Sequence, residues 1–385
     1  MNAAPHIPAR LAAYYFMFFA HAGAYVSYFA LYLAGRGMTA AEIAFAVAMP
    51  QAARIVAPAL WGWLADAWGA RYPGARRAII VFSAFAMLAG FIVLPFVERA
   101  GAIAMLLLAM SLFSAGASPL VEAITFSVLE GRTGQYGPIR LWGSIGFILA
   151  VLGTGAWLDS ADALVLPGIL IGLAAATCVV SFALPSGAGA RAQHAGERLG
   201  AVLRRPDVLA FFGACFCMTA AHGTLYVFYS IYLAEAGYSK TLIGALWTLG
   251  VAAEVLLFLR LPRVTRRYSL RALLLASFAC AVLRFPAIGW GVDSLLLLAA
   301  AQLLHAATFG VFHAACVAAV HRLFPGALAA RGQALYSSIA YGLGGAAGSL
   351  VAGWSWTVFG PSASFMVSAL FAVLGAALVA WKVRV

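Results

Sequence analysis

The sequence predicts an all-α membrane protein with about twelve transmembrane helices arranged as two six-helix bundles. Hydrophobic residues make up 64% of the 385 residues and charged residues only 9%, a balance that a soluble globule cannot accommodate. Apolar runs long enough to cross a bilayer recur along the chain. One long polar interruption divides these runs six and six.

The apolar runs define the expected helices. They cover approximately 10–33, 40–64, 78–97, 102–128, 137–158, 163–184, 208–234, 240–260, 270–290, 294–321, 332–355 and 362–381. The first run is long enough to span and lacks the pattern of a cleavable signal, so we expect it to be retained. The polar interruption predicts an N-terminal bundle over 1–184, a cytoplasmic linker over 185–206 and a C-terminal bundle over 207–385.

The net charge of +12 is best explained by topology. Basic residues on one side of the expected helices are Arg71, Arg76, Arg77, Arg132, Arg191, Arg198, Arg204, Arg205, Arg263, Arg266, Arg267, Arg271, Arg322, Arg331, Lys382 and Arg384. The other side carries only Arg36, Arg99 and Lys240. The positive-inside rule therefore predicts cytoplasmic termini in a multi-pass protein of the inner membrane. The basic charge also favours contact with anionic lipid headgroups, and no nucleic-acid partner is expected.

An internal repeat connects the two predicted bundles. A shift of about 200 residues places 23–44 on 223–244, and the match continues through the polar turn after the helix. The identical pairs are Gly23/Gly223, Tyr32/Tyr232, Leu33/Leu233, Ala34/Ala234, Gly37/Gly237 and Ile43/Ile243. Such duplication is common in transporters, whose substrate sites lie between repeated bundles.

Two charges flank the turn between the fourth and fifth runs. Glu122 and Arg140 lie about nine residues either side of Gly131, which places them at similar depth, roughly 13 Å from the turn, in antiparallel helices. Charged groups inside apolar helices mark binding sites or ion pathways. A structural ion pair that fixes two helices is the alternative.

Several stretches resemble the major facilitator superfamily. GWLADAWGAR after the second run is similar to the superfamily's loop motif, which acts as a conformational latch between cytoplasmic helix ends. The resemblance implies that Asp66 pairs with arginines and that two glycines permit close approach. The implied latch residues are Gly62, Asp66, Gly69, Arg71, Arg76 and Arg77.

Within the superfamily the chain resembles the lactose permease group, and YGPIRLWGSIGF, HGTLYVFYSIYL, WTLGVAAEVLLF and QLLHAATFGVFHAA are similar to its phenylpropionate permease branch. The resemblance assigns Glu122 and Arg140 to substrate binding. It assigns Arg284 and His305 to proton coupling. The acidic residue that the relative carries one turn after this histidine is Thr308 here, so the coupling carboxylate must lie elsewhere or be missing.

Glu254 is the expected replacement, because it is the acidic residue well inside a span of the second half. Glu254 and His222 lie about sixteen residues either side of Tyr238, which makes them level at roughly 24 Å from that turn. We expect Glu254 to carry the proton, with His222, Arg284 and His305 setting its affinity. The alternatives are a Glu254–Arg284 pair that only ties helices, and histidines that only pack.

Arg54 is a third intramembrane arginine, on a helix face with Gln51 and Pro58. The expected inward charges are then Arg54, Arg140 and Arg284 against Glu122 and Glu254. The surplus positive charge favours an anionic substrate. Aromatic walls of the substrate site could come from Tyr25, Tyr28, Tyr226, Tyr229 and Trp142, although each alone is also typical of helix packing.

These observations predict a monomeric symporter that takes up a small organic solute with protons by alternating access. The preferred substrate is an aromatic monocarboxylate such as phenylpropionate, and a sugar or nucleoside is the alternative. A drug antiporter lacks support because GSIGFILAVLGTGAWL has no Gly-Pro-rich pattern. A membrane-embedded enzyme would need a large loop with clustered catalytic groups, which the sequence does not offer.

No cofactor or metal is expected, since the five cysteines lie in apolar runs without C-x-x-C spacing. A structural or receptor-like membrane protein remains a further alternative.

Overall fold

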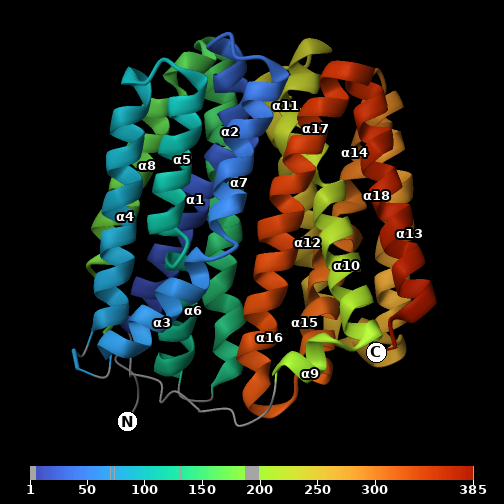
Figure 1. Ribbon diagram of the computed structural model, residues 1–385. Coiled ribbons are helices and arrows are strands. Elements are labelled where there is room, and N and C mark those ends of the chain that lie inside the picture. Colours follow the sequence, from blue (N-terminus) through green and yellow to red (C-terminus); the bar gives the residue numbers. More distant parts are fainter. Residues whose placement is uncertain (1–5, 70, 73, 130–131, 187–198, 385) are drawn as a thin grey trace. The chain divides into compact units, whose positions relative to one another are not determined.

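The computed structural model describes residues 6–69, 71–72, 74–129, 132–186 and 199–384, and Figure 1 shows helices throughout this part of the chain. Eleven of its helical segments are long and apolar enough to cross a membrane, each matching one predicted span. The twelfth prediction, 332–355, falls in a continuous helical run over Ala329–Phe359 that is rich in glycine and serine. Most of the predicted linker 185–206 lies outside the described residues.

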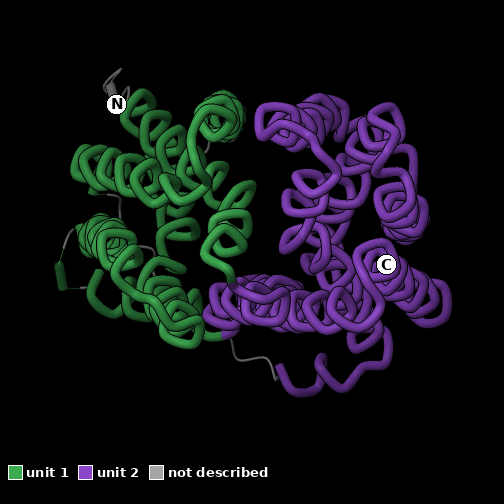
Figure 2. Tube along the Cα trace, turned by 90° about the horizontal axis from the view of Figure 1, so that it is seen from above, with its two compact units in different colours: residues 1–37, 56–192 green, residues 38–55, 193–385 purple. Residues whose placement is uncertain are grey.

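Two compact units divide the chain, and Figure 2 colours them separately. Unit 1 comprises residues 1–37 and 56–192. Its helices are α1 (His6–Gly35), α3 (Ala57–Gly69), α4 (Ala75–Val93), α5 (Ala100–Ser114), α6 (Ala117–Leu129), α7 (Tyr136–Ser160) and α8 (Leu166–Ser181), with short 3₁₀ segments η1 (Leu94–Phe96), η2 (Thr133–Gln135) and η3 (Ala163–Val165). Helix α1 packs on α7 and α8, and α4 packs on α5, α6 and α8.

Unit 2 comprises residues 38–55 and 193–385. Its helices are α2 (Ala40–Ala53), α9 (Leu199–Leu203), α10 (Pro206–Ala221), α11 (Gly223–Glu235), α12 (Lys240–Arg267), α13 (Leu270–Trp290), α14 (Leu295–Leu303), α15 (Phe312–Leu323), α16 (Ala329–Tyr336), α17 (Gly345–Phe359) and α18 (Pro361–Lys382), with a 3₁₀ segment η5 (Gly326–Leu328). The predicted span 40–64 is interrupted by a turn at 54–56. Its first part, α2, packs on α17, because Gly353 leaves room for Ala44.

Matched glycines of the internal repeat have matching roles in the two units. Gly37 and Gly237 both adopt positive φ, at 77° and 86°, a conformation that favours glycine and ends the preceding helix in a turn. A Cβ on Gly23 would lie 2.8 Å from the carbonyl oxygen of Phe147 in α7. A Cβ on Gly223 would collide with the backbone of Gly348 in α17. Both glycines therefore allow backbone-to-backbone packing, as expected for membrane helices in contact.

Irregular helix turns concentrate in unit 2. The helical path turns at His222, which ends α10 and precedes α11. Two π-helical segments, η4 (Ala306–Val311) and η6 (Ser337–Gly344), interrupt the α-helical hydrogen-bond pattern. Such segments are rare and occur frequently at functional sites. The first begins directly after His305, which places a loosened turn at one of the predicted proton-coupling residues.

Candidate functional site

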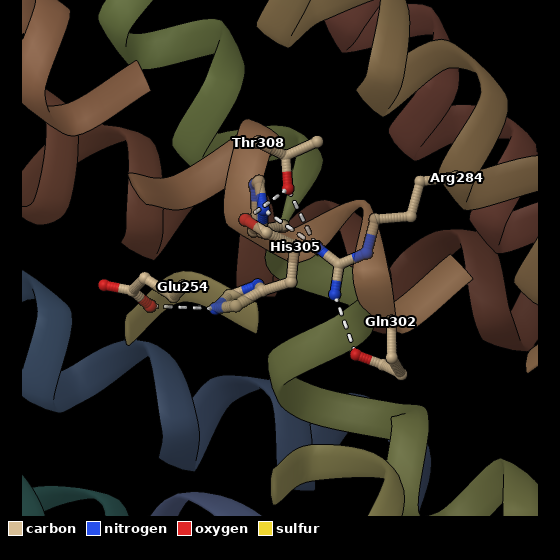
Figure 3. A network of polar contacts seen from close by, with 6 residues as sticks. Glu254, Arg284, Gln302, His305 and Thr308 are labelled. Carbon is tan, nitrogen blue, oxygen red and sulfur yellow. Dashed lines mark hydrogen bonds and ion pairs between the residues drawn. The ribbon is translucent and has the colours of Figure 1, made fainter. Parts of the chain in front are cut away.

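Glu254 and His305 are in contact in unit 2. Glu254 lies on α12 and His305 follows α14; the His305 Nε2 and Glu254 Oε2 atoms are 3.5 Å apart (Figure 3). Both side chains are largely buried, with 15% and 8% exposure for Glu254 and His305. Gly250, one turn before Glu254, permits this approach, because its Cβ position is 3.3 Å from His305 Cβ and from Gln302 Oε1. The structure thus brings together two of the predicted proton-coupling residues.

Arg284 of α13 is fully buried beside this contact. Its guanidinium donates to Thr308 Oγ1 at 3.0 Å and to Gln302 Oε1 at 3.1 Å (Figure 3). Within the described residues no carboxylate forms an ion pair with Arg284. The alternative of a Glu254–Arg284 ion pair that only ties helices is therefore not realised in this structure. Thr308, which stands where the resembling transporter has an acid, is a neutral acceptor for the arginine.

His222 is also held by Arg284, whose Nη1 lies 3.4 Å from His222 Nε2. Because a guanidinium can only donate, this ring nitrogen must accept. The other ring nitrogen, Nδ1, is 2.8 Å from the carbonyl oxygen of Met218 and must donate. These two contacts fix His222 as the neutral Nδ1-protonated tautomer in this conformation.

Tyr226 of α11 connects the predicted substrate residues of unit 2 to this cluster. Its ring stacks on His222 at 5.9 Å and on Trp247 at 6.0 Å. Its hydroxyl is within electrostatic reach of Arg284, Glu254 and Arg54. Arg54, the exposed C-cap residue of α2, therefore belongs to the surroundings of the same cluster. Tyr229, one turn after Tyr226, is fully buried and meets Trp247 edge to face at 5.4 Å.

A second polar group in unit 2 joins α15 to the end of α16 and to the π-helical segment η6 that follows it. The Nδ1 atom of His313 lies 3.1 Å from the Tyr336 hydroxyl and 2.9 Å from the Tyr341 hydroxyl. His313 is also within electrostatic reach of Glu254. Sequence reasoning missed these tyrosines and Gln302. Gln302 had a detectable signal, since it is three residues before His305 in an otherwise apolar run and shares its helix face.

The predicted pair of unit 1, Glu122 on α6 and Arg140 on α7, interacts electrostatically but forms no ion pair among the described residues. The Arg140 guanidinium instead lies over the Phe19 ring, with 3.9 Å from its carbon to the ring centroid, and 5.6 Å from that of Tyr15. Tyr15 in turn contacts Thr125 on α6 at 3.2 Å between their hydroxyl oxygens. Aromatic rings of α1 therefore hold Arg140 in place, and the structural ion pair considered from the sequence is not made.

The remaining aromatic residues predicted for the substrate site lie on α1 and α7. Tyr28 is fully buried and donates to the Val151 carbonyl oxygen at 3.0 Å, which ties α1 to α7. Tyr25 stacks on Phe29 with ring centroids 4.6 Å apart. Trp142 is 49% exposed and lies 6.5 Å from Phe16. Tyr28 thus serves helix packing in this conformation, whereas Trp142 presents a large accessible face.

The predicted latch contains one ion pair. Asp66 at the end of α3 accepts from Arg76 of α4 at 3.1 Å, and Arg77 donates to the Leu184 carbonyl oxygen at 3.4 Å. Arg71 is exposed. A Cβ on Gly62 or Gly69 would meet no described atom within 4 Å. The close approach expected at these two glycines is therefore not made in this structure.

Buried ionisable groups within bilayer-spanning helices mark substrate and ion pathways, and transporters place them in repeated helix bundles. The helical fold and the buried polar cluster therefore define a multi-pass membrane transporter. No group of three or more described His, Cys, Asp or Glu residues could hold a metal ion.

Residues 9–367 match the MFS_1 like family, and the chain belongs to this family. It is 31% identical over 373 residues to the probable 3-phenylpropionic acid transporter of Escherichia coli (strain K12), covering 94% of each chain. It is 26% identical over 333 residues to the putative nucleoside transporter YegT of the same organism, covering 82% of this chain and 76% of the relative. A crystal structure of a mutant nucleoside transporter NupG has the same fold, with a TM-score of 0.87 at 19% identity, covering 98% of this chain and all of that one.

These comparisons confirm the predicted resemblance to the major facilitator superfamily and the predicted fold class. The protein is a secondary transporter of the major facilitator type, and the similar proteins are transporters rather than enzymes.

Proposed function

We propose that this protein is a proton-coupled uptake transporter of the inner membrane, and that its substrate is an aromatic monocarboxylate such as phenylpropionate. The observation that carries the proposal is the Glu254–His305 contact beside a buried arginine that has no described carboxylate partner. A carboxyl and an imidazole in contact can exchange a proton, and the neighbouring cation makes their charge state sensitive to what binds nearby. The similarity to the probable 3-phenylpropionic acid transporter supports the same substrate class.

In this mechanism Glu254 carries the transported proton. His305 is in contact with Glu254, and Arg284 sets the local charge beside its contacts with Gln302 and Thr308. A proton on Glu254 removes a negative charge from a partly buried site, and its release restores that charge. Because buried charge is costly in a membrane protein, the two protonation states favour different helix arrangements, which couples the proton to alternating access.

The other predicted residues have separate roles in the proposed transporter, as substrate contacts or as a conformational latch. Glu122 and Arg140 are offered as polar substrate contacts of unit 1, with Trp142 as an accessible aromatic surface. Arg54 and Tyr226 are offered as substrate contacts of unit 2. The Asp66–Arg76 ion pair acts as the latch that stabilises one conformation of the transport cycle. We propose cytoplasmic termini, in accordance with the distribution of basic residues.

A nucleoside or sugar is the second candidate substrate. The putative nucleoside transporter relative and the similarity to the NupG structure favour it. A neutral, hydroxyl-rich solute is normally bound by neutral hydrogen-bonding groups. The surplus of intramembrane arginines and the absence of a described carboxylate partner for Arg284 favour an anion instead.

Uptake into proteoliposomes tests the proposal. Vesicles with an inward proton gradient are given labelled 3-phenylpropionate, uridine or maltose, and the internal concentration is measured with and without a protonophore. Protein-free vesicles are measured in parallel, because the protonated acid can cross a lipid bilayer unaided and be trapped inside as the anion. The proposal predicts accumulation of the aromatic acid above that of protein-free vesicles, and abolition of this difference by the protonophore. Accumulation of uridine or maltose, with none of the acid, would establish the alternative.

A further inference from the structure

Three nitrogen atoms in one buried cluster have no hydrogen-bond partner among the described residues. They are Arg284 Nε, Gln302 Nε2 and His305 Nδ1, on side chains whose residues are 0%, 1% and 7% exposed. The fully buried Tyr229 hydroxyl, which interacts with the Gln302 side chain, belongs to the same cluster. Buried polar atoms are nearly always satisfied in folded proteins. Three such nitrogen atoms in neighbouring side chains would be satisfied by a ligand that offers hydrogen-bond acceptors.

The three side chains are held together by contacts on the protein side. The Arg284 Nη2 atom donates to Gln302 Oε1 at 3.1 Å. Gln302 and His305 are three residues apart on one helix face, and the Cβ position of Gly250 is 3.3 Å from atoms of both. Figure 3 shows the arginine and the glutamine directed toward one another, with the histidine turned to Glu254. The cluster is thus preorganised by α12, α13 and α14.

The chemistry of the unpartnered atoms indicates the ligand class. Arginine Nε is a donor only, and Gln302 Nε2 must be the amide nitrogen because its oxygen already accepts from the guanidinium. His305 adds a third donor whenever its ring carries a proton on Nδ1. The described contacts bring no carboxylate to Arg284. Two to three donors around an uncompensated guanidinium match a carboxylate, which accepts through two oxygens.

We propose that Arg284, Gln302 and His305 form the subsite that binds the carboxylate of the transported solute. This inference rests on the proposed function, which it deepens by placing the anionic end of the substrate in unit 2. The subsite adjoins the Glu254–His305 contact, so the substrate anion and the proton bind to the same group of side chains. The negative charge of the bound carboxylate and the positive charge of the bound proton compensate one another. Binding of both together is therefore more favourable than binding of either alone.

Arg140 in unit 1 is the alternative binding residue for the substrate carboxylate. The Arg140 guanidinium interacts electrostatically with the Glu122 carboxylate, so its charge is partly compensated within the protein. Arg284 has no carboxylate ion-pair partner among the described residues, and its Nε is unpartnered. The three atoms of the unit 2 subsite are covered in this conformation, and substrate reaches them in another state of the alternating-access cycle.

Gln302→Glu tests the subsite with minimal change in shape. The new side chain keeps an acceptor for Arg284, removes the free amide donor and supplies an internal carboxylate that competes with the ligand. Binding of labelled 3-phenylpropionate and of the neutral 3-phenylpropanamide is measured on purified protein. We expect the acid to bind about tenfold more weakly or worse, with the amide changed by about twofold or less. Gln333→Glu makes the same chemical change on α16 of the same unit and serves as the matched control.

Gln302→Met provides a second variant that removes the donor without adding charge, in case the glutamate impairs folding. It should weaken binding of the acid about threefold to tenfold. Equal binding of the acid by wild-type protein and either folded variant would overturn the subsite while leaving the proposed function intact. Failure of the wild-type protein to bind any aromatic acid would overturn both proposals.

Discussion

His222 accepts a hydrogen bond from Arg284 through Nε2 and donates one to the Met218 carbonyl oxygen through Nδ1. Both ring nitrogens are thereby committed, and the ring is neutral. A histidine that is neutral by its contacts orients the arginine and holds no additional proton in this conformation. Among the four predicted proton-coupling residues, this relationship separates His222 from Glu254 and His305.

The first prediction follows from this separation. His222→Gln places an amide oxygen where Nε2 accepts and cannot titrate. Proton-driven accumulation of substrate should therefore persist within about threefold of wild type, since the acceptor for Arg284 is retained. Accumulation in proteoliposomes is the measurement. Loss of accumulation with preserved exchange of substrate would make His222 part of the proton pathway after all.

Arg140→Lys tests the proposed substrate contact of unit 1. An ammonium keeps the charge but loses the planar face that lies over Phe19 and the fork of donors. Substrate affinity should fall about fivefold or more, equivalent to about 1 kcal/mol, the typical contribution of one hydrogen bond, because the ammonium cannot form the paired hydrogen bonds that the guanidinium makes to the substrate. Arg36→Lys is the matched control, because Arg36 of the same unit contacts the Val97 carbonyl oxygen outside the proposed site. Near-normal affinity in the Arg140 variant would remove this residue from the substrate contacts.

Asp66→Asn tests the latch. The Asp66–Arg76 pair is partly exposed at the aspartate, whose side chain is 47% accessible, so its loss should cost only about 0–1 kcal/mol of stability. Transport should slow, while substrate binding stays close to wild type, because the pair stabilises one conformation rather than the ligand. Asp207→Asn breaks another carboxylate–arginine pair, with Arg205, and controls for a general effect. Abolished binding in a folded Asp66 variant would place this residue in the site instead.

Gly223→Ala tests the tight packing of repeat-related helices. The added methyl group would collide with the backbone of Gly348, and overpacking of this kind costs about 1–3 kcal/mol. The melting temperature of the detergent-purified protein should fall. Gly62→Ala, whose Cβ would meet no described atom, should melt at the wild-type temperature or slightly above it, because alanine is favoured over glycine inside a helix. Equal melting temperatures for both variants would contradict the packing described for α11 and α17.

The sequence was informative where a physical requirement leaves a mark on residue type. Gly37 and Gly237 are recognisable because the left-handed turn requires glycine, and Glu254 is recognisable because a carboxyl in an apolar run is costly. Glu254 and His305 were expected in one cluster, but their direct contact could not be predicted, since it depends on the approach of α12 to α14 at Gly250. The stacking of Arg140 on Phe19 also depends on tertiary packing, which leaves no local pattern. The π-helical turn after His305 changes the side-chain register in a way that an ideal helix period does not anticipate.

Glu254→Gln tests the central claim that Glu254 carries the transported proton. Glutamine keeps the size and hydrogen-bonding capacity of the side chain but cannot bind and release the proton. Accumulation driven by a proton gradient and counterflow exchange of labelled substrate are measured on the same reconstituted variant, with wild-type protein as reference. The account predicts that accumulation is abolished and counterflow is retained, because substrate exchange needs the conformational change but no deprotonation. Wild-type accumulation by this variant would contradict the claim, and loss of both activities in a folded protein would make Glu254 a binding or structural residue.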